Sequence, residues 1–80
     1  MITEPTQRAF DRALISEDPL SALRRFVATR LEGGMSRDAV LGELEELRRE
    51  LRRRHRERDE DVVLDVMDFV SGWASPHMRI

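Results

Sequence analysis

The sequence predicts an all-α fold, a small three- or four-helix bundle built from αα-hairpins. Apolar residues recur every three or four positions in four segments. Capping residues, prolines and glycines of the kinds that begin and end helices separate these segments. No segment shows the alternation of apolar and polar residues that is typical of a half-buried strand. With a length of 80 residues, the chain is expected to form one helical domain over residues 1–80.

The first expected helix spans about residues 4–16. Thr3 is a residue type that caps helices, and Pro5 lies in the opening turn, where proline is tolerated. Phe10 and Leu14 stand four residues apart and therefore share one face of this helix.

The second expected helix spans about residues 19–32. It begins with Asp18, a capping residue, followed by a proline at the first helical position. Leu23 and Val27 mark its apolar stripe. The pair Gly33-Gly34 ends it, because either glycine can adopt the left-handed conformation found after helix C-termini.

The third expected helix spans about residues 37–57 and follows Ser36, another capping residue. An apolar seam runs from Val40 to Leu51 at helical spacing. Residues 52–61 then contain no apolar side chain. The seam therefore ends before the expected helix does.

The fourth expected helix spans about residues 60–72, with Asp59 as its cap. Five arginines among residues 52–58 give way to three acids at residues 59–61. Cations stabilise the end of one helix and anions the start of the next, so a helix boundary is expected here. No glycine or proline enforces this break, and one continuous helix over residues 37–71 is the alternative.

The last segment contains β-branched residues, but Asp65 and Asp68 interrupt any strand pattern. In a helix Asp61, Asp65 and Asp68 fall on one stripe at i, i+4 and i+7, and apolar residues occupy the other directions. This segment is therefore expected to be the most deeply buried helix. The predicted core consists of Phe10, Leu23, Val27, Leu44, Leu47, Val66, Phe69 and Val70.

The composition excludes several classes of site. The chain has no cysteine and only two histidines, so neither disulfides nor a structural zinc site is expected, and no cofactor or metal is predicted. The beginning of the chain shows no signal peptide and no window is apolar enough to span a membrane, which predicts a cytoplasmic protein. All 14 basic residues are arginine, which indicates a GC-rich coding sequence and, with it, a bacterial origin.

Seven arginines among residues 48–58 form the strongest charge run. Nucleic-acid binding through phosphate contacts is one interpretation. The net charge of −2 argues against it, because nucleic-acid-binding domains are usually basic. The stretch from Ser36 to Leu47 resembles the second helix of a helix-turn-helix, although its four carboxylates would face the phosphates.

No residue pattern indicates catalysis, and the chain is expected not to be an enzyme. A chain this short has little core of its own, so we expect a protein-interaction module that self-associates or binds one partner protein. A toxin-neutralising immunity or antitoxin protein is the more specific hypothesis, because an acidic surface complements a basic toxin. A DNA-binding regulator using Ser36–Leu47 or Arg48–Arg58 is the alternative, and no membrane partner is expected.

The residues expected to bind the partner are charged side chains of the last two helices and apolar side chains of the C-terminal segment, residues 73–80. Aromatic residues and methionine are enriched in the centres of interfaces. Packing of the C-terminal segment against the protein's own helices is the alternative. The predicted partner-binding residues are Arg52, Arg53, Arg56, Asp61, Asp65, Asp68, Trp73, Met78 and Ile80.

Overall fold

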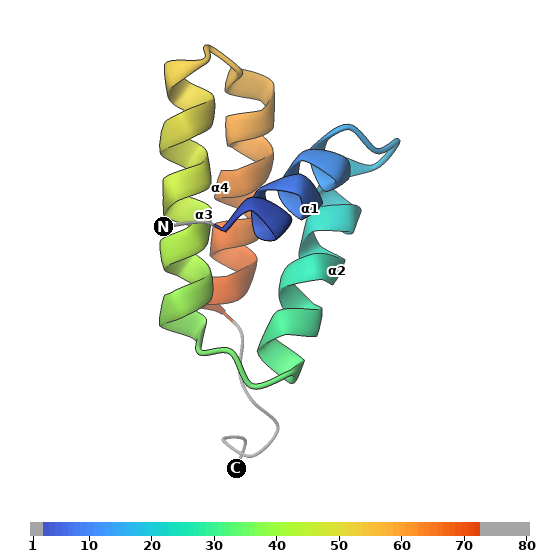
Figure 1. The fold of residues 1–80 in the computed structure, drawn as a ribbon, viewed down its shortest axis with the longest axis vertical. Coiled ribbons are helices and arrows are strands. Elements are labelled where there is room, and N and C mark those ends of the chain that lie inside the picture. Colours follow the sequence, from blue (N-terminus) through green and yellow to red (C-terminus); the bar gives the residue numbers. More distant parts are fainter. Residues whose placement is uncertain (1–2, 73–80) are drawn as a thin grey trace.

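The computed structural model describes residues 3–72 of the chain and contains four α-helices with no strand in that range (Figure 1). The prediction of an all-α fold with four helices is confirmed. The helices are α1 (Glu4–Leu14), α2 (Pro19–Glu32), α3 (Arg37–Arg53) and α4 (Glu57–Ser71).

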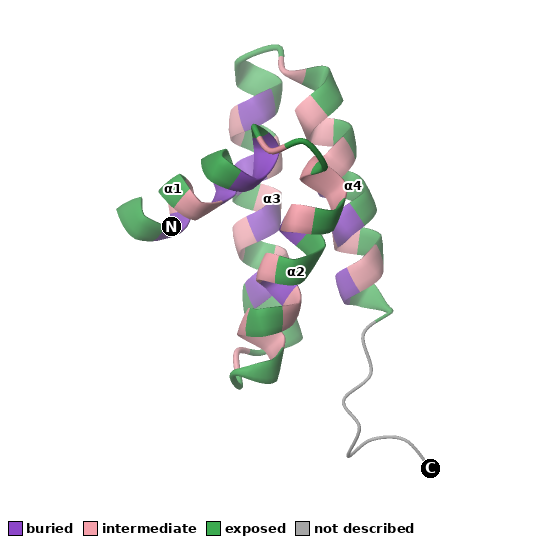
Figure 2. Ribbon diagram, turned by 90° about the vertical axis from the view of Figure 1, so that its right-hand side faces the viewer, coloured by how far each residue is buried: buried purple, intermediate pink, exposed green. Residues whose placement is uncertain are grey.

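The most extensive packing between two helices is that of α3 against α4, which run antiparallel as a hairpin (Figure 1). Helix α2 packs on both helices of this hairpin, and α1 packs mainly on α2. Figure 2 shows buried segments on every helix, interleaved with exposed ones, as amphipathic helices require. One side of the α3–α4 hairpin is therefore covered by α2, and its charged outward side chains remain exposed.

The core is one apolar cluster to which every helix contributes. The rings of Phe10 and Phe26 meet edge to face at 5.3 Å, which fastens α1 to α2. The core prediction is confirmed except for Phe69, which is only half-buried, with the Arg24 guanidinium over its ring. The buried apolar residues are Phe10, Ala13, Leu14, Leu23, Val27, Val40, Leu44, Leu47, Leu51, Val63, Val66 and Val70.

Helix α4 is not the most buried helix, contrary to expectation. It buries three side chains, whereas α3 buries four.

The contact between α2 and α3 includes an ion pair between Arg30 and Glu43. The guanidinium and carboxylate atoms approach to 2.8 Å but outside hydrogen-bond angles, and the Arg30 side chain also lies over the Phe26 ring.

Three helices begin where predicted, after Thr3, Asp18 and Ser36, and only the start of α4 differs. Asp18 and Ser36 accept hydrogen bonds from the backbone N–H groups of Ser21 and Ala39, at 3.2 and 3.1 Å. Thr3 is the N-cap residue of α1, as predicted, but it makes no capping hydrogen bond; its hydroxyl donates to the Thr6 hydroxyl at 2.9 Å. Asp59 does not cap α4 but lies within its first turn.

The break between the last two helices lies earlier than predicted. Helix α3 ends at Arg53 instead of residue 57, α4 begins at Glu57 instead of residue 60, and the continuous helix over residues 37–71 is excluded. His55 has a left-handed φ of 58°. Around it the Arg56 N–H donates to the Leu51 carbonyl at 2.9 Å and the His55 N–H to the Arg52 carbonyl at 3.1 Å.

This pair of hydrogen bonds is a Schellman motif, and the same motif ends α2. There Gly34 holds the left-handed position, with φ 103°, and Met35 donates to the Arg30 carbonyl. The sequence prediction found the glycine-based motif and missed the second one, because histidine does not mark a left-handed residue.

Helix α1 ends at Leu14, two residues earlier than predicted.

Replacing His55 with glycine is expected to raise the free energy of unfolding by up to about 1 kcal/mol, because glycine adopts positive φ without a clash of Cβ. Urea denaturation followed by circular dichroism measures the change. Gly34→Ala is the matched control at the equivalent position of the other motif, and it should lower stability by a similar amount. A less stable His55→Gly variant would show that the histidine ring has another role.

Candidate functional site

The outward face of α4 carries the acidic stripe predicted from the sequence. Asp61, Asp65 and Asp68 are all exposed, one helical turn after another. Leu64 lies among them, three residues after Asp61 and four before Asp68, and is 42% exposed. We call the residues Glu57, Asp61, Leu64, Asp65 and Asp68 the α4 outer face.

The three aspartates have no partner cation in the part of the chain that the structure describes. Within residues 3–72 none of them forms an ion pair or a side-chain hydrogen bond. In the described residues Arg52, Arg56 and Arg58 do not neutralise the stripe, although they lie close to it in the sequence. The Arg56 guanidinium instead donates to the Asp59 carboxylate at 2.8 Å.

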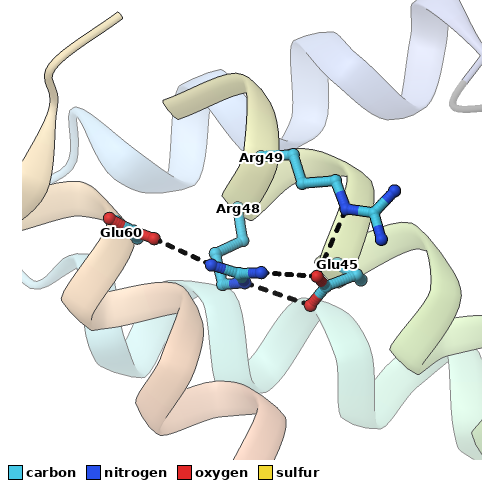
Figure 3. A network of polar contacts seen from close by, with 4 residues as sticks. All are labelled: Glu45, Arg48, Arg49 and Glu60. Carbon is cyan, nitrogen blue, oxygen red and sulfur yellow. Dashed lines mark hydrogen bonds and ion pairs between the residues drawn. The ribbon is translucent and has the colours of Figure 1, made fainter. Parts of the chain in front are cut away.

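Most arginines of the run at residues 48–58 are engaged by carboxylates. Arg48 lies between α3 and α4 and joins Glu45 of its own helix to Glu60 of the next (Figure 3). Its nitrogen donors lie 2.5 and 3.0 Å from the two Glu45 oxygens and 3.0 Å from Glu60. The pairing is part-buried and ties the two helices of the hairpin together.

The exposed arginines of α3 pair along the helix surface. Arg49 lies 3.4 Å from Glu45, and both Arg53 and Arg54 bind Glu50. Such exposed pairs at helical spacing contribute little to stability. Arg53 and Arg56, two predicted partner-binding residues, are thus occupied by Glu50 and Asp59.

The pairing with Arg48 makes stability depend on pH. Hydrogen bonds from Arg48 hold the pKa of Glu45 below its ordinary value of 4.5. A carboxyl with a lowered folded-state pKa stabilises the protein above its unfolded pKa, and this stabilisation is lost as the pH falls through the folded value. We expect Glu45→Gln to be less stable than wild type at neutral pH and closer to it at about pH 3. Urea midpoints at the two pH values measure this, and an equal difference at both would contradict it.

Arg52 and Arg58 form no ion pair within the described part of the chain. Arg52 lines a hollow of about 600 Å³ between α3 and α4, close to the turn that joins them. Glu57, Asp61 and Leu64 of the α4 outer face line the same hollow. We call this the turn-end hollow. It brings together, around an exposed leucine, charged side chains of both signs that have no partner among the described residues.

Sequence reasoning placed the aspartates correctly but missed Leu64. Its position between Asp61 and Asp68 in helical spacing was the available signal, but the apolar residues around it in sequence suggested burial. The predicted anchors Trp73, Met78 and Ile80 lie outside the described residues.

No other site in residues 3–72 suggests a different chemistry. No group of three or more side chains there could hold a metal ion. A second hollow, of about 880 Å³, opens between Gln7 of α1 and the arginines of α3, and the carboxylates Glu46 and Glu50 also line it. None of the helices in the described part is long and apolar enough to cross a membrane. Comparison with protein families, curated proteins and solved structures finds no match for this chain.

Proposed function

We propose that the chain is a small cytoplasmic protein-interaction module that binds a basic protein surface through the α4 outer face. The observation that supports this most is that no cation of residues 3–72 pairs with Asp61, Asp65 or Asp68, although that part of the chain is rich in arginine. Carboxylates placed at i, i+4 and i+7 match cations arranged along a partner helix or groove.

Two further features of the α4 outer face support the proposal. Three like charges on neighbouring helical turns repel each other, so they oppose helix formation by a few tenths of a kcal/mol per pair. Exposed like charges that cost stability suit a role in binding, because a partner's cations would relieve the repulsion. Leu64, exposed at the centre of these charges, offers an apolar contact that a partner would cover.

Within this proposal, a toxin-neutralising protein of the immunity or antitoxin type is the more specific candidate. Its support is the acidic face, which complements basic toxins and would speed their association. This candidate requires a partner that is toxic when expressed alone and harmless when expressed with this chain.

Site-specific photo-crosslinking tests the proposal in cells. A photoreactive amino acid at position 65 should give an adduct with a protein, at a segment rich in lysine or arginine. The same amino acid at position 25, an exposed site of α2, is the matched control and should give no such adduct. Adding Asp61→Asn and Asp68→Asn to the position-65 variant should suppress the adduct. An adduct that forms equally at both positions, or none at position 65, contradicts the proposal.

DNA binding is the second candidate, supported by Arg52 and Arg58, which lack an intramolecular carboxylate in the described residues. Arg53 and Arg56, by contrast, are paired with Glu50 and Asp59. A DNA-binding role predicts that Arg52→Ala with Arg58→Ala weakens binding of duplex DNA and lowers its salt dependence. Fluorescence anisotropy with labelled duplex measures this, and unchanged affinity would exclude the candidate.

A further inference from the structure

We propose that a second copy of the chain docks on the turn-end hollow, with Arg52 of each copy bound to Asp61 of the other. The inference rests on the proposed function, a protein-binding α4, and adds the identity of one partner.

The hollow holds charged side chains of both signs that form no ion pair within residues 3–72. Arg48 and Glu60, which also line it, are bound to each other. Arg52, Glu57 and Asp61 line the same hollow and form no ion pair in the described residues. A purely basic ligand would leave Arg52 without a negative charge to bind. A purely anionic ligand would be repelled by Asp61.

A second copy supplies a counter-charge to Arg52 and to Asp61 at once and leaves only Glu57, which is exposed to water, without one. In a twofold-symmetric interface the same patch faces itself, so a residue that contacts another is contacted by its counterpart in return. A patch with Arg52 on α3 and Asp61 on α4 is self-complementary in this sense. Leu64, exposed beside Asp61, lies within the same patch and would lose water on docking.

The contact is expected to be weak and sensitive to salt. The hollow presents one exposed leucine and a few charged side chains. The surface buried on docking would therefore be smaller than the roughly 1,200–2,000 Å² that stable complexes bury. Exposed charges are screened over about 8–10 Å at physiological salt. The dimer should therefore form at high protein concentration in low salt, and dissociate as salt is raised.

Analytical ultracentrifugation of the full chain and two reversed variants tests the inference. In about 50 mM salt, wild type should approach twice the 9.4 kDa chain mass, and about 500 mM salt should return it to the monomer. Arg52→Glu places two carboxylates opposite each other, and Asp61→Arg places two guanidiniums opposite each other. Each variant alone should raise the dissociation constant at least about tenfold.

Sedimentation of an equimolar mixture of the two variants is the most direct test of the contact between Arg52 and Asp61. In the mixed dimer Glu at position 52 meets Arg at position 61, and the native Arg52 meets the native Asp61, so both contacts are favourable. The mixture should dimerise about as tightly as wild type. Arg8→Glu and Glu4→Arg, an exposed ion pair on α1, are the control substitutions and should leave the wild-type dimer unchanged.

The remaining outcomes overturn the inference. They are a wild-type monomer at about 0.5 mM protein, a dimer insensitive to both reversals, or a mixture of the reversed variants that stays monomeric. Absence of this dimer, with an adduct at position 65 that Asp61→Asn and Asp68→Asn suppress, removes the inference and leaves the proposed function standing. Absence of both the dimer and the adduct overturns the inference and the proposed function together.

Discussion

Leu44→Ala is expected to lower the free energy of unfolding by about 3 kcal/mol, within a range of about 2–5 kcal/mol for buried leucines. Leu44 lies in the middle of α3 and is completely buried at the centre of the core. Removing its side chain loses transfer free energy and leaves a cavity that the four helices cannot close. A chain of 80 residues has a total stability of only about 4–12 kcal/mol, so this change is large.

Urea denaturation in high salt measures the effect on the monomer. Leu64→Ala is the matched control, because it removes the same atoms from a side chain that is 42% exposed. It should cost well under about 1 kcal/mol. Similar losses for the two variants would contradict the packing described for α3 and α4.

Phe10→Ala is expected to cost about 3–5 kcal/mol and to release α1 before the other helices. Phe10 is 1% exposed and meets Phe26 of α2 edge to face. Because α1 packs mainly on α2, this ring carries a large share of its attachment. Amide hydrogen exchange should therefore speed up in α1 first, as local unfolding of the least attached element.

The control for this prediction is Phe69→Ala, a half-buried ring on α4 that lies beneath Arg24. Its loss should be smaller and should not change exchange in α1 selectively. Uniform acceleration of exchange in all four helices of the Phe10 variant would show that α1 unfolds only with the whole bundle.

Local signals in the sequence predicted much of this fold. Asp18, Ser36 and Gly34 mark three helix ends through side-chain or backbone chemistry that depends on a few neighbours. The apolar seam of α3 likewise predicted burial at Leu44 and Leu47. The turn at His55 was not predictable in this way, because neither glycine nor asparagine, the usual left-handed residues after a helix, marks the end of α3.

The candidate site was only partly predictable for the same reason. Helical spacing placed Asp61, Asp65 and Asp68 on one stripe, as the structure shows. Which arginines are occupied depends on contacts between helices, such as Arg48 with Glu60. The pairing of Arg56 with Asp59, and the unpaired state of Arg52 within the described residues, follow from where the helix break lies.

The central claim is that Asp61, Asp65 and Asp68 are not needed for the fold and are available to a partner. Urea denaturation of the triple variant Asp61→Asn, Asp65→Asn, Asp68→Asn tests it most directly. The three amides keep the side-chain shape and remove the mutual repulsion. We expect a free energy of unfolding within about 0.5 kcal/mol of wild type, or slightly higher. A loss of more than about 1 kcal/mol would show that these carboxylates stabilise the fold, and would contradict the claim.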